Sequence, residues 1–204
     1  MKEEEVRPFP RAMAVTGGIG SGKSRVALWL AEACALPLYD ADGEVRSLLR
    51  PGEPGWQRLR TRLGPEYFGV DGDLLKAKLR QALFADEVMR RAVEHDLHPL
   101  VLSNLRAKIS GLKTPCLVEV PLLYEAGWQG YFARVLVVCA DEPTCRQRVM
   151  TRDGISEEQA MAAIRAQMPI MRKAPLADYA VDNSGAWAST VHQLEEIKKK
   201  WCGR

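Results

Sequence analysis

Residues 17–24 read Gly-Gly-Ile-Gly-Ser-Gly-Lys-Ser, a complete G-x-x-x-x-G-K-[ST] motif. A short apolar run, residues 12–16, precedes the motif, and residues 25–33 have the pattern of a helix. A loop of this kind connects a buried strand to the amino terminus of a helix, so that backbone N–H groups and the helix dipole face an anion. The motif therefore predicts an α/β domain with a nucleotide-phosphate site at this turn.

Each part of the motif has a chemical reason. The glycines let the backbone curl around phosphate groups, Lys23 would reach the β- and γ-phosphates, and the Ser24 hydroxyl would ligate Mg²⁺. A glycine-rich turn that matches by chance is disfavoured, because the expected strand and helix flank it. The residues predicted to contact the nucleotide here are Gly18, Gly20, Ser21, Gly22, Lys23, Ser24 and Arg25.

Four more apolar runs suggest further strands, at residues 35–39, 116–120, 135–139 and, more weakly, 180–181. Continuous runs of this length are typical of strands buried on both faces of a parallel sheet. Helical stretches alternate with them, and this order indicates an α/β fold. The helix predictions with specific support are a capping box at residues 156–159 and apolar residues at helical spacing in 93–109 and 190–201.

The second and third predicted strands are separated by far more chain than a usual crossover contains. We interpret residues 44–114 as an inserted helical subdomain within a single domain that spans residues 1–204. The nucleotide-binding core then comprises residues 12–43 and 115–204. Within the core, the arginine-bearing stretch in residues 146–160 is a candidate lid, because mobile arginines that close over a triphosphate serve phosphoryl transfer. An exposed, charged helix end is the alternative.

Composition excludes several classes of protein. The chain is 47% hydrophobic and 27% charged, as in soluble globular proteins, and its net charge of +3 is too small to argue for nucleic acid. We find no apolar signal region near the amino terminus and no run of eighteen apolar residues. The five cysteines are odd in number, lack metal-ligand spacing and are interpreted as reduced. We expect a cytoplasmic protein without a membrane partner.

A GTPase would carry a guanine-reading N-K-x-D after a later strand, and the chain has none. Residues 40–43 match D-x-x-G by spacing only. A motor or transport ATPase would normally be larger. A small phosphate-loop domain with a helical insertion and an arginine-rich segment therefore fits a small-molecule kinase best.

Short segments beyond the phosphate loop are similar to one family of kinases. Asp40-Ala41-Asp42 follows the second predicted strand, and Pro121-Leu122-Leu123-Tyr124-Glu125 follows the third. The other matching segments are Val15 to Ser24, His98-Pro99, Gln147-Arg148, Arg152-Asp153-Gly154, Gln167, Ala177-Asp178 and Asp182-Asn183-Ser184-Gly185. Taken together, from Met13 to about Ile197, the sequence resembles the dephospho-coenzyme A kinase family.

The resemblance implies a fold and a reaction. The fold would be a three-layer α/β/α phosphate-loop kinase with a five-stranded parallel sheet, an inserted helical acceptor subdomain and a lid, related to nucleoside monophosphate kinases. The reaction would be transfer of the γ-phosphoryl of ATP, with Mg²⁺, to the ribose 3′-hydroxyl of dephospho-coenzyme A. The implied partners are these two small molecules, with no nucleic acid, and the chain would be a monomer or a weak homo-oligomer.

The resemblance also implies roles for single residues. Asp42 would be the base that accepts the hydroxyl proton, with helix capping by Asp40 or Asp42 as the alternative. Glu119, where many members of the family carry Asp, would help to hold Mg²⁺, although its greater length puts direct ligation in doubt. His98 would serve the acceptor site or be structural. The remaining implied residues are Leu123 and Glu125 for the acceptor, Arg148 and Arg152 in the lid, and Asn183 and Gly185 near the adenine.

One residue departs from the pattern at the phosphate loop itself. Arg25 stands where the family usually has Thr, and it would either add a phosphate contact or face solvent. Two other hypotheses stay open. One is a kinase for a nucleoside monophosphate or another small alcohol, and the other is a nucleotide-binding module without turnover.

Overall fold

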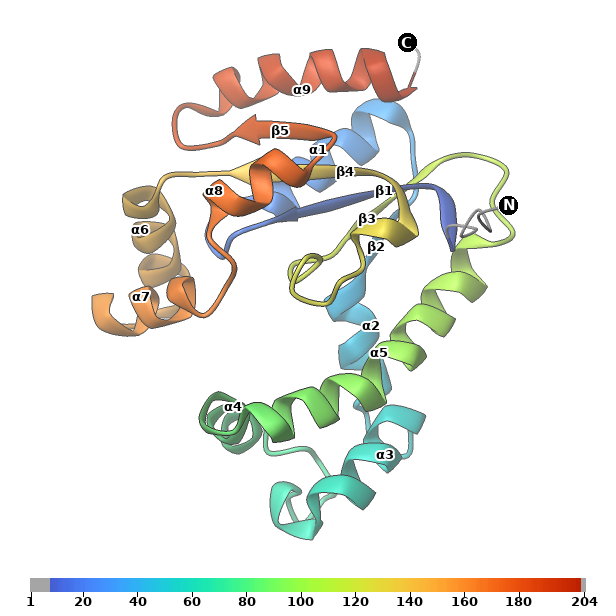
Figure 1. Cartoon of the computed structure of the whole chain (residues 1–204), viewed down its shortest axis with the longest axis vertical. Helices are drawn as coiled ribbons and strands as arrows, with labels where there is room; N and C mark the ends of the chain where they lie inside the picture. The colour runs from blue at the N-terminus through green and yellow to red at the C-terminus, as the bar shows by residue number, and fades with distance from the viewer. Residues whose placement is uncertain (1–7, 203–204) are drawn as a thin grey trace, which may run out of the picture. The chain divides into compact units, whose positions relative to one another are not determined.

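The computed structural model describes residues 8–202, except for the side chains of residues 84 and 202. Its described part contains a five-stranded parallel sheet with the order β2-β3-β1-β4-β5 (Figure 1). The strands are β1 (Phe9–Gly17), β2 (Leu38–Asp40), β3 (Cys116–Glu119), β4 (Phe132–Cys139) and β5 (Tyr179–Asp182). The predicted α/β fold with a five-stranded parallel sheet is confirmed.

The strand register brings the carboxyl ends of the strands to one edge of the sheet. Asp40 at the end of β2 pairs with Glu119 at the end of β3, and Gly17 at the end of β1 pairs with Val138 in β4. Parallel α/β sheets bind ligands at this edge. The phosphate loop therefore leaves the central strand where a ligand site is expected.

Helices alternate with the strands, as the buried parallel sheet requires. Met13 and Val15 of β1 belong to an apolar cluster with Val26 and Leu30 of one helix and Leu194 of another. The residue between them on β1 is also fully buried, so both faces of this strand are covered. The helices outside the predicted insertion are α1 (Lys23–Cys34), α6 (Glu142–Asp153), α7 (Glu157–Arg165), α8 (Ile170–Lys173) and α9 (Trp187–Cys202), with 3₁₀ turns η2 (Gln129–Tyr131) and η3 (Ala174–Leu176).

One predicted strand begins later than expected, for a local reason. The prediction places a strand at residues 35–39, but Ala35 is the left-handed cap of α1, with φ of 52°. Its N–H and that of Leu36 donate to carbonyl groups in the last turn of α1, which ends the helix and delays β2 to Leu38. The capping box at Ser156 and Gln159 is present as predicted.

The described chain folds into two compact units. The helical unit is Ala41–Gly111, and the rest of the described chain forms the sheet unit. The predicted insertion, residues 44–114, overlaps the helical unit closely, but Asp42, which the prediction places in the nucleotide-binding core, belongs to the helical unit. The elements of this unit are α2 (Ala41–Leu48), α3 (Pro54–Leu63), η1 (Pro65–Tyr67), α4 (Lys76–Ala85) and α5 (Glu87–Ile109).

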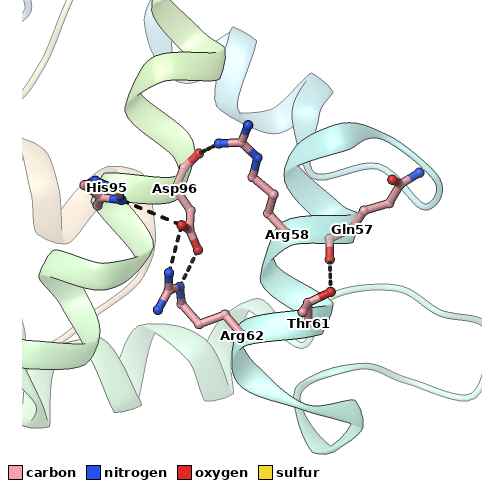
Figure 2. A network of polar contacts seen from close by, with 6 residues as sticks. All are labelled: Gln57, Arg58, Thr61, Arg62, His95 and Asp96. Carbon is pink, nitrogen blue, oxygen red and sulfur yellow. Dashed lines mark hydrogen bonds and ion pairs between the residues drawn. The ribbon is translucent and has the colours of Figure 1, made fainter.

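The helical unit has its own apolar core, which includes Leu59 and Leu63 of α3 and Val93 and Leu97 of α5. Polar side chains join the same two helices (Figure 2). Arg62 forms a two-point contact with the Asp96 carboxylate, and Arg58 donates to the Asp96 carbonyl at 3.0 Å. Lys108 likewise pairs with the buried Glu44, which joins α5 to α2.

The cysteines depart in part from the prediction. Cys116, Cys139 and Cys145 are free thiols, as expected, whereas Cys34 at the end of α1 is disulfide-bonded. The expectation of reduced cysteines is therefore wrong at Cys34. Within residues 8–202, no helix combines the length and apolar character that a membrane span needs.

Candidate active site

The phosphate loop connects β1 to α1, as the motif predicts. Gly20 and Gly22 have φ of +78° and +84°, values that side chains other than glycine rarely adopt. A Cβ atom at Gly20 would lie 2.5 Å from the carbonyl oxygen of Cys145, and one at Gly22 would collide with the side-chain amide of Asn183. The chain can follow this path only with glycine at both positions. Lys23 is the first residue of α1, and so it stands at the positive end of the helix dipole.

The outer face of the loop is held by hydrogen bonds to its carbonyl groups. The Asn183 amide donates to the Ser21 carbonyl at 2.7 Å, and Arg148 donates to the Gly20 carbonyl at 3.3 Å and to the Asn183 carbonyl at 2.9 Å. Asn183 is buried, and its Oδ1 accepts a bond from Thr190 at 2.9 Å. These bonds hold the backbone of the loop in place around the site where its N–H groups would bind phosphates.

Ser24 and Glu119 meet at the edge of the sheet. The Ser24 hydroxyl donates to Oε1 of Glu119 at 2.7 Å, across ninety-five positions of sequence. A hydroxyl and a carboxylate in contact are ligands that suit Mg²⁺, which keeps several waters and uses few protein groups. In the described chain, no group of three or more His, Cys, Asp and Glu lies together as a metal site. The two residues fit a magnesium ion that takes its other ligands from water and phosphate.

The predicted adenine side contains an unexpected contact. The Arg25 guanidinium lies over the ring of Trp187, 3.9 Å from its centroid. Arg25 is exposed in the first turn of α1, and Trp187 begins α9 immediately after the loop that contains Gly185. The cation–π contact gives Arg25 a defined position beside the phosphate loop. Arg25 therefore does not simply face solvent in this structure, because it contacts Trp187.

Two residues predicted for the acceptor have other contacts. Leu123 is fully buried, so its side chain belongs to the core and is not available to a ligand in this structure. The Glu125 carboxylate is bound by the Lys173 ammonium at 2.8 Å and by the Met168 N–H at 2.9 Å. Both positions follow β3 directly, and the turn there points their side chains inward and toward α8.

The predicted lid comprises most of α6 and the start of α7, which lie side by side in Figure 1. Arg148 lies on α6 against the phosphate loop, while Arg152, one turn later, makes a two-point contact with its neighbour Asp153. The pKa of the Cys145 thiol, also on α6, is raised mainly by burial, and Arg148 opposes the shift. A protonated thiol is a poor nucleophile, and so Cys145 is a packing residue of this helix.

The helical unit holds the other two predicted residues. Asp42 is exposed in the first turn of α2, where a carboxylate is favoured by the helix dipole. His98 lies half-buried in α5, and burial lowers its pKa, with Glu94 acting in the opposite direction. His98 is therefore neutral at neutral pH, and its ring can both donate and accept a hydrogen bond.

Comparisons with known proteins agree with this geometry. The family model described as dephospho-CoA kinase matches residues 11–189. The chain belongs to the dephospho-CoA kinase family. Proteins named dephospho-CoA kinase from Geobacillus kaustophilus and Symbiobacterium thermophilum are 37% and 38% identical, over 93% and 95% of this chain and 96% and 82% of theirs.

Solved structures show the same fold. A crystal structure from Thermus thermophilus is 32% identical with a TM-score of 0.79, and covers 94% of this chain and 98% of that one. The dephospho-CoA kinase from Campylobacter jejuni has a TM-score of 0.67 at 21% identity, and covers 95% of this chain and 98% of its own. Membership of the dephospho-CoA kinase family makes the chain an ATP-dependent kinase, a transferase.

Sequence reasoning missed three parts of the site. The contact of Asn183 with Ser21 was not predicted, and the assignment of Asn183 to the adenine stays a prediction. Lys173, which follows Arg172, gives no sign in the sequence that it is fully buried. Gln167 stands out only as a matching residue of the dephospho-CoA kinase family, although its side chain reaches the phosphate loop.

Proposed function

We propose that the chain transfers the γ-phosphoryl of ATP to the ribose 3′-hydroxyl of dephospho-coenzyme A, giving coenzyme A and ADP. The observation that carries the proposal is the contact between Ser24 and Glu119 at the mouth of a complete phosphate loop. Membership of the dephospho-CoA kinase family supports the identity of the acceptor.

The sheet unit supplies the ATP side of the reaction. The N–H groups of the loop and the amino terminus of α1 would bind the phosphates, and Lys23 would bridge the β- and γ-phosphates and stabilise the charge that develops on transfer. Ser24 and Glu119 would hold Mg²⁺, whose charge offsets that of the β- and γ-phosphate oxygens when it is bound. Arg25, positioned by its contact with Trp187, would add a positive charge next to the same phosphates.

The helical unit supplies the acceptor side. Asp42 would accept the proton of the attacking hydroxyl and orient the oxygen toward the γ-phosphorus. His98, neutral at neutral pH, would bind a polar group of the acceptor without adding charge. The Glu125 carboxylate is already bound by Lys173, so it would not contact the acceptor directly. Its effect on the acceptor site would be indirect, through the position of residues 168–173, which it contacts at both ends.

The two arginines of the lid would act differently. Arg148 already lies against the loop carbonyls, and from there its charge would favour bound phosphates. Arg152 contacts only its neighbour Asp153 in the bonds we observe, and that exposed local pair is weak enough to be exchanged for a phosphate oxygen. We expect the stretch 146–160 to become more ordered when both substrates bind.

The test is ADP release with MgATP and purified chain, in parallel reactions with dephospho-coenzyme A, AMP, CMP and no acceptor. Release that depends on dephospho-coenzyme A, with the phosphate located on the ribose 3′-oxygen by ³¹P NMR, supports the proposal. ADP release with AMP or CMP, and not with dephospho-coenzyme A, would mean that the chain phosphorylates another acceptor. ATP binding without release to any acceptor would favour a nucleotide-binding module and overturn the proposal.

We infer that the reaction takes place in the cytoplasm, where ATP is available. Both proposed ligands are small molecules, so the chain requires neither nucleic acid nor membrane. A monomer or weak homo-oligomer is sufficient, because every residue assigned above lies in one chain. Sedimentation at micromolar concentration, with and without ATP, measures the oligomeric state.

A further inference from the structure

A fully buried lysine lies outside the residues assigned to the reaction. Lys173 ends α8 and has no exposed surface, which is rare for a lysine unless its charge is compensated. Its ammonium lies 2.8 Å from Oε1 of Glu125, whose side chain is 24% exposed. No hydrogen bond of ordinary geometry reaches the ammonium within the described part of the chain. The carboxylate of Glu125 therefore provides the charge that allows Lys173 to be buried.

The same carboxylate oxygen also holds the backbone five residues earlier. Oε1 of Glu125 accepts the N–H of Met168 at 2.9 Å. One carboxylate thus fixes both ends of the segment 168–173, which follows the predicted lid and leads from α7 to α8 (Figure 1). We call residues 166–173 the arm. One hydrogen bond and one ion pair to the same carboxylate leave the arm little freedom to shift.

The residue just before the fixed segment contacts the phosphate loop. Oε1 of Gln167 accepts the N–H of Ile19 at 2.7 Å, in a partly buried position. Ile19 is the third residue of the phosphate-loop motif, whose amides would surround the phosphates. Gln167 itself is tied to the end of α7, since its N–H donates to the Ile164 carbonyl at 3.2 Å. The arm therefore joins the lid helices to the phosphate loop through one side chain.

We propose that Gln167 is a positioning residue for phosphoryl transfer, and that the Glu125–Lys173 ion pair holds it in place. The hydrogen bond fixes the orientation of the Ile19 peptide and thereby the direction of the neighbouring N–H groups of the loop. Donors that are already oriented toward developing charge accelerate transfer, and a displacement of about 1 Å costs on the order of a hundredfold in rate. The inference rests on the proposed function of the loop.

The first experiment compares Gln167→Met with wild type in the ADP-release assay. Methionine keeps the length of the side chain but replaces the amide oxygen that accepts the Ile19 N–H, since its only polar atom is a thioether sulfur, a weak acceptor. We expect kcat to fall by about ten- to a hundredfold, KM for ATP and acceptor to stay within about threefold, and Tm to change little. Unchanged kcat would overturn the positioning role.

Gln193→Met is the matched control, because Oε1 of Gln193 also accepts a backbone N–H, that of Asp182, at 2.9 Å. It removes this bond and the two that the Gln193 amide donates to the carbonyl groups of Asp182 and Ser189, so it is the harsher change, and kcat should still stay within about twofold of wild type. An equal fall in kcat for both variants, or a fall in Gln167→Met that follows a loss of Tm, would show a merely structural role and overturn the proposal.

The amide signal of Ile19 in ¹H–¹⁵N NMR gives a readout that needs no turnover. Loss of the acceptor in Gln167→Met should move this signal upfield and raise its hydrogen exchange, with and without ATP. If wild type shows no transfer but the Ile19 signal responds as expected, the proposed function fails while the contact stands. If wild type transfers phosphate and the Ile19 signal is unaffected by the substitution, the contact is absent in solution and the inference alone fails.

The anchor is tested separately with Glu125→Gln, Lys173→Met and the double variant. Glu125→Gln leaves the buried Lys173 ammonium without its charge partner and should lower Tm strongly, whereas Lys173→Met leaves Glu125, which is partly exposed, and should lower Tm less. The double variant should recover part of the loss seen in Glu125→Gln. Because Gln167 remains in the double variant, its kcat should fall by a factor smaller than in Gln167→Met. A double variant with wild-type kcat and an Ile19 signal like wild type would overturn the anchoring role.

Discussion

The two units of the molecule hold their polar residues in different ways. In the sheet unit, side chains beside the phosphate loop bond to backbone atoms that are far away in the sequence, as Asn183 does to Ser21 and Gln167 does to Ile19. In the helical unit, the contact between α3 and α5 includes a pair of charged side chains, Arg62 and Asp96, beside the bond of Arg58 to the Asp96 carbonyl. Backbone atoms are fixed by the fold, whereas two long charged side chains must each be ordered and are screened by salt.

The difference suggests that the two kinds of contact serve different purposes, positioning for catalysis and stability of the fold. Contacts to the backbone suit groups that must be positioned for transfer, since their geometry follows that of the sheet and the loop. Contacts between side chains suit the assembly of a helical unit, where modest energies are sufficient. Substitutions in the first set should therefore change kcat more than stability, and those in the second set should do the reverse.

The largest effect is expected at Lys23, in the sheet unit. Lys23→Ala should lower kcat by about 10³-fold or more, because no other assigned side chain bridges the β- and γ-phosphates. Steady-state kinetics with MgATP and dephospho-coenzyme A measures the loss. Lys199→Ala, in an exposed pair with Glu196 on α9, is the matched control and should leave kcat unchanged. A kcat near that of wild type in Lys23→Ala would show that the phosphate loop does not take part in phosphoryl transfer.

Asp42 is the exception within the helical unit, because we assign it to the chemistry itself. Asp42→Asn should keep the Kd for ATP within about threefold but lower kcat by about 10²- to 10⁴-fold, since asparagine cannot accept the proton. Kd is measured by calorimetry and kcat by ADP release. Asp71→Asn, an exposed loop residue of the same unit, serves as control. A kcat close to wild type in Asp42→Asn would leave the base unassigned.

Glu119 tests the metal site of the sheet unit. Glu119→Gln should raise the Mg²⁺ concentration for half-maximal rate by about tenfold or more, because the charge that attracts the ion is lost. Glu119→Asp keeps the charge and should be affected less. Removal of Mg²⁺ with EDTA should abolish transfer by wild type. A magnesium dependence identical in the three proteins would contradict the role of Glu119.

Arg62 should give the smallest effect on the reaction and a measurable one on stability. The pKa of Asp96 is lowered, first by the hydrogen bond from Arg62, with burial acting against it. A lowered pKa in the folded state means that ionised Asp96 stabilises the fold above the ordinary carboxyl pKa of about 3.9 and that this contribution is lost as pH falls through the folded pKa.

Arg62→Ala should therefore lower Tm by a few degrees at pH 7, with a difference from wild type that shrinks below about pH 4. Thermal unfolding followed by circular dichroism at several pH values measures this. Arg91→Ala removes a more exposed pair with Glu87 on α5 and should change Tm by less than about a degree. If Arg62→Ala lowered kcat clearly and left Tm unchanged, the proposed difference between the two units would be contradicted.

Local patterns in the sequence predicted most of the fold. The phosphate loop, the buried strands and the capping box at Ser156 each depend on residues a few positions apart, and the structure contains all three. The strand predicted at residues 35–39 is misplaced because Ala35 adopts a left-handed conformation that composition does not reveal. Apolar residues alone cannot separate the end of a helix from the start of a strand.

The contacts of the site were harder to predict, because they join distant residues. Ser24 and Glu119 could be related through the motif and the strand end, and they do meet. The bonds of Arg148 to Gly20 and Asn183 depend on how α6 packs against the loop, and no spacing in the sequence encodes that packing. The burial of Lys173 depends in the same way on Glu125, forty-eight positions earlier.

Arg148 has a consequence for how the chain tolerates mutation. The atoms that accept its hydrogen bonds are main-chain oxygens of Gly20 and Asn183, which every amino acid provides. Substitutions of neighbouring side chains can leave these hydrogen bonds intact as long as the backbone keeps its conformation. A change at Arg148 itself removes every one of them at once. The bonds of Arg148 thus require one particular side chain on the donating side and none on the accepting side, where Gly20 and Asn183 are restricted for other reasons, by a positive φ and by the bond of Asn183 to Ser21.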